Sequence, residues 1–218
     1  PLRRQRQMCI RDRLWVDVET SGLRAGHDLL LEVGLVVTGP DLTLITEATW
    51  TVPYRDATLA VVMERCDPVV RAMHEESGLW AECSAGEDGL SKLVAITSPA
   101  LHPAVQQIAS EISDLTREHG ADTAPLAGSS VHFDDQWLRH WFRSFMDTRD
   151  AAGVYRRVDV SSWKEALKRT ARGREIIASC PEPVRAHRAA HDIHDSISEL
   201  RHYLVSLGLI GTVGGGHD

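Results

Sequence analysis

The clearest pattern in the chain is at residues 14–19, where aliphatic side chains at every second position alternate with aromatic or acidic ones. An alternation with period two predicts a β-strand that buries one face. Side chains two residues apart on a strand point to the same face, so we expect Asp17 and Glu19 to lie side by side. The turn-forming residues 20–22, Thr-Ser-Gly, predict that the strand ends just after these acids.

Two carboxylates on one face of an apolar strand repel each other, and burying them is costly unless a cation lies between them. Asp17 and Glu19 at an open strand end could therefore hold a divalent metal ion. The alternative is an exposed edge strand that carries two solvated acids. The pair alone leaves both interpretations open, and the metal interpretation requires more ligands elsewhere in the chain.

The rest of the pattern predicts an α/β protein. Residues 29–37 are almost continuously apolar, which predicts a buried central strand, and residues 42–52 alternate again after a turn signal. Strands first, then alternating helices and short strands, predict a mixed central sheet flanked by helices in an α/β sandwich. The other expected elements are a helix at 57–74 interrupted by Pro68, helices at 103–119, 134–146, 161–169 and 184–207, and short strands at 125–127 and 158–160, with an irregular segment at 84–100.

The length and charge of the chain narrow the function classes. A chain of 218 residues is most simply one domain, large enough for a substantial core. Its net charge of −7 lacks the basic excess that proteins gripping long nucleic acids usually show. If the ligand is a polyanion, we expect it to be short or held by few contacts.

The four cysteines are scattered, without a CxxC pair, which argues against a zinc knuckle and fits a reducing compartment. No apolar run approaches the length of a membrane span, and no signal peptide is visible. We therefore expect a cytoplasmic protein that does not bind a membrane.

Both ends of the chain differ from the middle. Residues 1–13 are crowded with arginine, lack periodicity and include a stretch, Met-Cys-Ile-Arg-Asp, that resembles a translated sequencing adapter. We expect a non-native or disordered segment there, with a disordered basic arm as the alternative. The glycine-rich residues 208–218 predict a disordered tail. The domain is then expected to span residues 14–207.

Two further acids stand where a metal site would need them. Asp134 follows a strand and a loop of small residues, although an acid at a helix start can simply favour the helix dipole. Asp192 lies on the last predicted helix, five residues after His187. His187 and His191 could instead form a zinc pair, but no Glu directly follows His187 and no nearby Cys completes a tetrahedral set. Hard carboxylate ligands prefer magnesium or manganese.

At these residues the sequence resembles a family, the oligoribonucleases of the DEDDh exonuclease superfamily. The resemblance spans roughly residues 14 to 203, and the segments at 73–79 and 155–161 make the narrower assignment. The matching segments are 14–23 (LWVDVETSGL) for the first exonuclease motif, 128–134 (GSSVHFD) for the second, 187–192 (HRAAHD) for the third, and 73–79 (MHEESGL) and 155–161 (YRRVDVS) for the family's own features.

This resemblance implies an RNase H-like fold and a 3′-to-5′ exoribonuclease that degrades short single-stranded RNA to mononucleotides. It implies two Mg²⁺ or Mn²⁺ ions held by the four acids, with His187 as the general base on the attacking water. It also implies a homodimer in which Tyr155 and Arg156 reach the site of the other subunit. The residues implied to bind substrate are Leu23 as a wedge against the terminal base, His74, Ser130 and Arg156 at the 5′ phosphate, and Tyr155, which reaches in with Arg156 from the second subunit.

The chain departs from the family pattern at a few positions. His191 stands where the family often has Asp, residues 133–136 differ from the usual Gln-Asp-Arg-Arg, and Val69 stands near a position where some members place a stacking Trp. Two alternative functions are a proofreading-type or RNase T-like exonuclease on single-stranded DNA or RNA, and an inactive exonuclease-like domain that binds nucleic acid. Inactive sites usually lose a carboxylate or the histidine, and this chain has all five.

Overall fold

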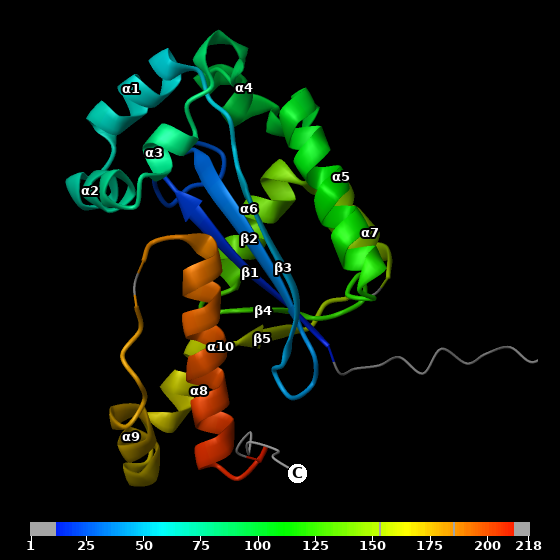
Figure 1. The fold of residues 1–218 in the computed structure, drawn as a ribbon, viewed down its shortest axis with the longest axis vertical. Helices are drawn as coiled ribbons and strands as arrows, with labels where there is room; N and C mark the ends of the chain where they lie inside the picture. Colours follow the sequence, from blue (N-terminus) through cyan, green and yellow to red (C-terminus); the bar gives the residue numbers. More distant parts are fainter. Residues whose placement is uncertain (1–11, 153, 185, 212–218) are drawn as a thin grey trace, which may run out of the picture.

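The computed structural model describes residues 12–152, 154–184 and 186–211, which are built around a five-stranded mixed sheet (Figure 1). The order of its strands is β3-β2-β1-β4-β5. This arrangement confirms the predicted α/β fold with a mixed central sheet. The strands are β1 (Arg13–Thr20), β2 (Leu30–Thr38), β3 (Leu44–Thr51), β4 (Leu126–Gly128) and β5 (Arg157–Asp159).

Strand β1 is the centre of the sheet, because it pairs antiparallel with β2 on one side and parallel with β4 on the other. In the β1–β2 register, Asp17 lies opposite Gly34 and Glu19 lies opposite Glu32. Directly opposed residues of antiparallel strands point to the same face of the sheet. The two acids of β1 therefore share their face with Gly34 and Glu32.

Helices cover both faces of the sheet. Helix α10 crosses one face in front of β1 and β2, while α5, α6 and α7 lie on the other side (Figure 1). The helices are α1 (Asp56–Arg65), α2 (Pro68–Glu76), α3 (Leu79–Glu82), α4 (Lys92–Thr97), α5 (Pro103–Glu118), α6 (His132–Trp141), α7 (Arg143–Ala151), α8 (Val160–Leu167), α9 (Ala171–Ala178) and α10 (Ala189–Ser206), with short 3₁₀ turns η1 (Gly86–Asp88) and η2 (Pro99–Leu101).

The pleat of β1 divides the core into two layers. Leu14, Val16 and Val18 pack into the larger cluster, which includes side chains of α5 and α6. Trp15 packs into a second cluster with Ile193 and other side chains of α10. Alternate residues of a strand face opposite sides of its sheet, so Asp17 and Glu19 face α10, as Trp15 does.

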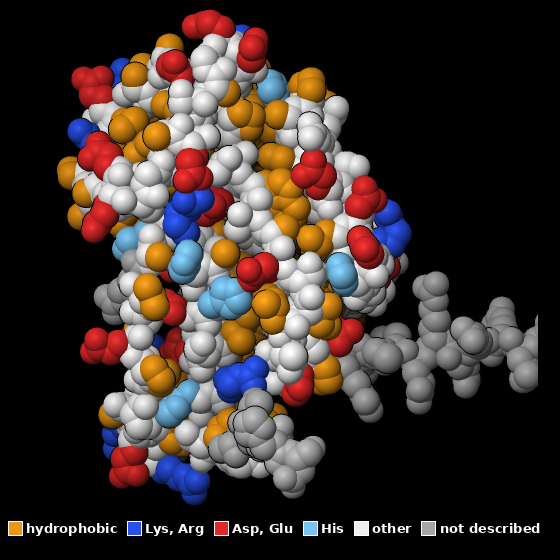
Figure 2. Space-filling view, in the orientation of Figure 1, with side chains coloured by type: hydrophobic (Ala, Val, Ile, Leu, Met, Phe, Trp, Pro, Cys, Tyr) orange, Lys and Arg blue, Asp and Glu red, His pale blue; other side chains and the backbone are white. Residues whose placement is uncertain are grey.

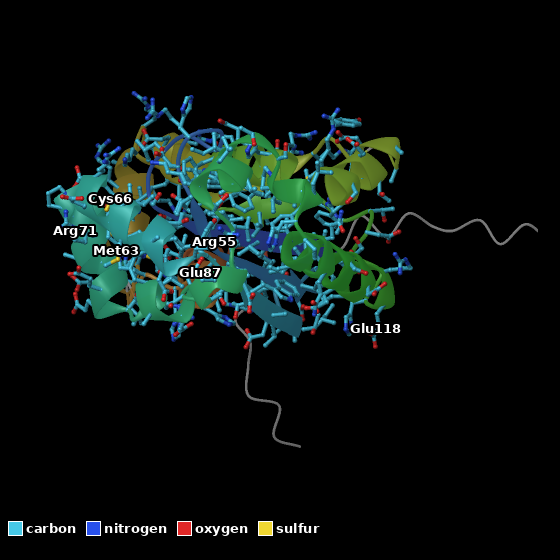
Figure 3. All side chains as sticks on the ribbon, turned by 90° about the horizontal axis from the view of Figure 1, so that it is seen from above. Arg55, Met63, Cys66, Arg71, Glu87 and Glu118 are labelled. Carbon is cyan, nitrogen blue, oxygen red and sulfur yellow. The ribbon has the colours of Figure 1, made fainter. Side chains whose placement is uncertain are left out.

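Local sequence explains where the first helices begin and end. Pro68 is the first residue of α2, where its missing N–H costs nothing, and the Asp67 side chain accepts a hydrogen bond from Val69 N as the cap of that helix. The expected interruption at Pro68 is therefore confirmed. Seen from above, α1 and α2, with Met63, Cys66 and Arg71, form one end of the molecule (Figure 3).

Several predicted boundaries are wrong. The helix expected at 134–146 is two helices, α6 and α7, which meet at Phe142, where the backbone leaves the helical region and the ring is fully buried. The segment 84–100, expected to be irregular, contains α4, whose cap is Ser91. A further helix, α9, follows the one expected at 161–169. These short helices depend on tertiary packing more than on a long apolar periodicity.

The last helix begins five residues later than its expected start at Val184, at Ala189. His187 therefore lies in the turn before the helix and not on it. At the other end of the domain, Arg13 is already the first residue of β1, one residue before the expected boundary. Residues 1–11 and 212–218 lie outside the described residues, so the expectation of disordered ends stays a prediction there.

Arg149 fixes the chain that leads into β4. This buried arginine on α7 donates to the carbonyl oxygens of Ala121 at 3.1 Å, Asp122 at 3.3 Å, and Ala124. Burial lowers the pKa of its guanidinium to about 10. These hydrogen bonds to three carbonyls of one turn satisfy the buried guanidinium, and they hold the loop from which β4 starts.

Within the described part of the chain, no helix combines the length and the apolar character that crossing a membrane requires. The cysteines in that part, Cys66, Cys83 and Cys180, are free thiols.

Candidate metal centre

Three carboxylates meet at the end of β1. Ligand oxygens of Asp17, Glu19 and Asp192 all lie within 4.8 Å of one another, the spacing at which one cation can contact all three. Asp17 and Glu19 face α10 because of the strand pleat, and Asp192 stands in the first turn of that helix. The structure therefore brings together three of the four acids that the sequence analysis singled out.

Asp134 borders the same cluster from the opposite layer. It lies in the first turn of α6, is only 3% exposed, and its Oδ1 accepts a hydrogen bond from Val18 N at 3.0 Å. Burial raises the pKa of Asp134 to about 7, although its backbone hydrogen bonds act in the opposite direction. After burial itself, the charge of Asp134 is the largest cause of the raised pKa of Asp17.

The electrostatics of the cluster favour a cation. Burial, followed by the charges of Asp192 and Glu32, raises the pKa of Glu19 from 4.5 to about 8. Burial raises the pKa of Asp17 well above its ordinary value, and it raises the pKa of Asp192 as well. Such shifts mean that the ionised carboxylates are poorly stabilised by the protein alone. An all-oxygen donor set of this kind fits hard divalent ions such as Mg²⁺ or Mn²⁺.

His187 lies beside this cluster in the turn before α10. Its backbone has a positive φ of 51°, a conformation that residues other than glycine adopt at some cost. Burial is the main cause of the raised pKa of Asp192 and of the lowered pKa of His74; the electrostatic interaction with His187 opposes the first shift and adds to the second. His187 is therefore close to both the acid cluster and α2. Because His187 precedes α10, it is not one helical turn from His191, and the helical zinc pair that was considered does not form.

His74 is buried next to Glu19. The side chain is 1% exposed, its Nε2 lies 3.0 Å from Thr20 O and 4.0 Å from Glu19 Oε2, and its ring packs edge-on against Trp80. Burial lowers the pKa of His74, which favours the neutral imidazole. The structure thus places this histidine behind the acids rather than on an open surface where a phosphate would approach.

Ser130 lies in a group of hydroxyls beyond the end of β4. The Ser161 hydroxyl is 2.9 Å from that of Ser129 and 3.0 Å from that of Ser130. Asp159 Oδ1 accepts from the backbone N–H groups of Ser130 at 3.0 Å and Ser161 at 2.9 Å. Asp159 therefore caps α8, which starts at Val160, one residue before the expected helix start. Its carboxylate fixes both serine backbones next to the helix start.

The remaining sequence candidates are on the surface. Leu23 is 81% exposed in the loop after β1, and Tyr155 is 77% exposed before β5. The Arg156 guanidinium lies 5.9 Å from the centre of the Tyr155 ring, so these two residues contact each other. Among the described residues, no hydrogen bond or ion pair joins either of them to the acid cluster.

Sequence reasoning did not identify three residues that the structure places at the site. Glu32 is a buried acid in the otherwise apolar run 29–37, and that exception was the available signal. Ser161 entered the sequence analysis only as the first residue of an expected helix and the last of a matching segment. Arg188 was noted only as part of a matching segment. Its partners, Glu32 and Glu82, are 156 and 106 residues away in the sequence, so no local pattern could indicate the ion pairs.

Comparisons with known proteins agree with this geometry. No family model matches the chain. An oligoribonuclease from Rhodococcus jostii (strain RHA1) is 36% identical over 197 residues, which cover 89% of this chain and 87% of the relative. An oligoribonuclease from Mycobacterium bovis (strain BCG / Pasteur 1173P2) is 34% identical over 191 residues, covering 87% of this chain and 78% of the relative.

Among solved structures, Escherichia coli exonuclease I in complex with a dT13 oligonucleotide superimposes with a TM-score of 0.56 at 15% identity. The match covers 91% of this chain and 42% of exonuclease I, so the chain spans less than half the length of that enzyme. Exonuclease I from Methylocaldum szegediense matches with a TM-score of 0.56 at 18% identity, over 88% of this chain and 40% of that one. At such identities the likeness concerns the fold.

The sequence relatives cover most of both chains at identities well above those of the structural neighbours. The fold that the chain shares with exonuclease I and its own cluster of acids at the end of β1 are consistent with this relationship. The chain belongs to the oligoribonuclease family.

Proposed function

We propose that this protein is a metal-dependent exonuclease that shortens oligoribonucleotides from the 3′ end, down to dinucleotides, and releases nucleoside 5′-monophosphates. The observation that carries the proposal is the meeting of Asp17, Glu19 and Asp192 within 4.8 Å at the end of a central strand. The names of its sequence relatives favour short RNA as the substrate. The net charge of −7 supports a short substrate as well, because long nucleic acids require a broad basic surface.

The four acids would hold two divalent ions, either Mg²⁺ or Mn²⁺. Asp17, Glu19 and Asp192 would supply oxygens from one side, and Asp134, on α6, would supply a further carboxylate. Bound divalent ions in such sites activate water as a nucleophile and neutralise charge on the scissile phosphate. The raised pKa values of Glu19 and Asp134 support this role, because uncompensated carboxylates would otherwise retain protons near neutral pH.

His187 would act as the general base. As water attacks the phosphorus, the imidazole accepts its proton, and the bond between phosphorus and the 3′ oxygen of the preceding nucleotide breaks. The products are a nucleoside 5′-monophosphate and an RNA shortened by one nucleotide with a new 3′ hydroxyl. An imidazole suits this step because its ordinary pKa is near neutrality.

The substrate would lie along the exposed edge of the site. The proposed contacts are Leu23 against the terminal base and Ser130 at the 5′ phosphate, where the neighbouring hydroxyls of Ser129 and Ser161 offer further donors. We also propose a homodimer in which Tyr155 and Arg156 reach the site of the second subunit, because both are exposed and stacked on each other. His74 could contact the phosphate only through Nδ1, which has no hydrogen-bond partner, because Nε2 is bonded to Thr20 O.

A second candidate is an exonuclease that acts on single-stranded DNA. It is favoured by the structural neighbours, which include exonuclease I solved with a DNA oligonucleotide. The two functions differ in the sugar and the length of the preferred substrate, so one substrate series separates them. The cytoplasmic location expected from the cysteine pattern stays a prediction.

The test is hydrolysis of 5′-labelled, 5′-phosphorylated RNA and DNA, two to seven nucleotides long and at twenty nucleotides, with Mg²⁺, Mn²⁺ or EDTA. We expect stepwise loss of 3′ nucleotides from short RNA with either metal, and no cleavage in EDTA. Preference for the long DNA would favour the second candidate. Binding without turnover under every metal condition would instead support the inactive binding domain and overturn the proposal.

A further inference from the structure

Arg188, the residue directly after His187, makes a two-sided ion pair. Toward β2, its Nε lies 3.2 Å from both carboxylate oxygens of Glu32, and its Nη2 lies 2.7 Å from Glu32 Oε1. Toward α3, its Nη1 and Nη2 lie 2.9 Å and 2.7 Å from the two oxygens of Glu82. The space-filling view shows basic and acidic side chains in contact over the region where α3 meets the start of α10 (Figure 2).

The inner partner, Glu32, is fixed. Its side chain is 1% exposed, and besides Arg188 it accepts a hydrogen bond from Ala189 N at 2.8 Å. Ala189 is the first residue of α10, whose own N-cap residue makes no side-chain cap. Glu32 therefore caps the helix from a neighbouring strand, and a carboxylate is favourable at that end of the helix dipole.

Glu82, the outer partner of Arg188, belongs to a different part of the chain, helix α3. Glu82 ends α3, which follows α2, the helix that carries His74. One guanidinium thus connects β2, α3 and the turn that leads into α10. His187 is the residue just before Arg188 in that turn, and its positive φ of 51° needs support from surrounding contacts.

We propose that Arg188 is a positioning residue for hydrolysis: by bridging Glu32 and Glu82 it fixes the turn that holds His187 against the acid cluster. The inference deepens the proposed function and rests on it. It predicts that Arg188 acts through the histidine, so removing the bridge lowers the rate of the chemical step while substrate binding changes little. A misplacement of about 1 Å can cost about 100-fold in rate.

The geometry also explains why an arginine is needed. A planar guanidinium can pair with two carboxylates at once through separate N–H groups, whereas an ammonium group is a point charge. A second effect must be separated from positioning, because Arg188 also offsets the charge of Glu32, which lies opposite Glu19. Arg188→Lys keeps the charge and loses the two-sided bridge, so it distinguishes the two effects.

The first experiment measures kcat and KM on a 5′-phosphorylated RNA dinucleotide, at saturating Mg²⁺, for the wild type and four variants. We expect Arg188→Gln and Arg188→Lys to lower kcat about 10- to 100-fold with KM within about twofold, and Glu82→Gln to lower kcat by a smaller factor. Arg139→Gln is the matched control, since Arg139 also bridges two acids, Asp135 and Asp150, and should leave kcat unchanged. A wild-type kcat in Arg188→Lys would show that charge alone matters and would overturn the inference.

The second experiment is a double-mutant cycle with His187→Ala, using melting curves to confirm that each variant folds. If Arg188 acts through His187, then Arg188→Gln should change the residual rate of His187→Ala by less than about twofold. Effects that multiply would show that Arg188 acts elsewhere. A wild type that is inactive with both metals would refute the proposed function, whereas an active wild type with Arg188→Gln equal to Arg139→Gln would refute only this inference.

Discussion

Gly34 and Ala189 are in direct contact, and this contact sets the distance between α10 and the sheet. A Cβ atom added to Gly34 would lie 2.8 Å from the Cβ of Ala189 and 3.1 Å from its carbonyl carbon. Gly34 is opposite Asp17 in the β1–β2 register. The missing side chain therefore lets the start of α10, and with it Asp192, approach the acids of β1.

Replacing Gly34 by alanine should move α10 outward. We expect a loss of about 1–3 kcal/mol in the free energy of unfolding, typical of overpacking, and a fall in kcat because Asp192 moves away from Asp17. Denaturant unfolding and steady-state hydrolysis of short RNA measure the two effects. Gly26→Ala is the control, because a Cβ there meets nothing within 4 Å. Equal behaviour of the two variants would show that the close approach is unimportant.

Removing one acid of the cluster should raise the stability of the metal-free protein and strongly lower its activity. Burial and the charge of Asp134 raise the pKa of Asp17, which means that its ionised form is unfavourable in the folded protein. Asp17→Asn removes this carboxylate, so the metal-free variant should melt at a higher temperature than the wild type. The same change removes a metal ligand, and we expect a loss of about 100- to 1000-fold in kcat.

The control for the effects of Asp17→Asn on melting temperature and kcat is Asp114→Asn, which removes an exposed acid paired with Arg117. Surface ion pairs contribute little, so neither melting temperature nor kcat should change appreciably. If Asp17→Asn melted below the wild type in EDTA, the carboxylates would not be repelling one another as inferred.

The stability of the metal-free protein should depend on pH with a definite sign. The folded-state pKa of Glu19, about 8, is above its ordinary value of 4.5, and that of Asp134, about 7, is above 3.8. Between these values the folded state binds more protons than the unfolded state, so stability falls as the pH rises toward 8. Thermal melts in EDTA from pH 5 to 8.5 measure this contribution, and the Glu19→Gln variant should show a weaker fall.

Metal affinity should depend on pH in the opposite direction to the stability of the metal-free protein, because metal binding requires the ionised carboxylates and releases their protons. Affinity for Mg²⁺ or Mn²⁺ should therefore increase between pH 6 and 8. Calorimetry at pH 7 in buffers of different ionisation enthalpy measures the proton release. Metal binding that is independent of pH would contradict the raised pKa values.

Mixing inactive variants tests whether Tyr155 acts in the site of a second subunit. A mixed dimer of Tyr155→Ala and His187→Ala subunits should contain one complete site, and activity should recover to about a quarter of the wild type for random mixing. A mixture of Asp17→Ala and His187→Ala should stay inactive, because these residues belong to one site. No recovery in the first mixture, with dimers present, would place Tyr155 in its own subunit's site or outside any site.

The sequence predicted the strand-borne half of the site well. The alternation at 14–19 predicts that Asp17 and Glu19 share a face, and the structure shows that this face is the one α10 covers. The meeting of this pair with Asp192 was expected only from the family resemblance. Helical periodicity places Asp192 on a helix, but it carries no information about which strand that helix crosses.

The contacts that hold residues 187–192 in place could not be predicted from local sequence patterns. The apolar pattern placed the start of the last helix at Val184, because nothing local marks Ala189 as its first residue. The cap is Glu32, a residue of β2 that is distant in sequence. Likewise, the break at Phe142 arises from burial of its ring in the core, and the local sequence would equally allow a continuous helix.

Strand β1 lies at the centre of the sheet and is paired on both edges. The face to which each of its side chains points is therefore decisive for the acid cluster. A single residue inserted near its start, between Arg13 and Trp15, would exchange the two faces of all residues that follow unless the pairing with β2 and β4 slipped by the same step. The carboxylates would then point into the aliphatic layer of α5 and α6, and valines would take their place beneath α10. A substitution in β1 can therefore lower activity partially, whereas an insertion or deletion of one residue there is expected to abolish activity.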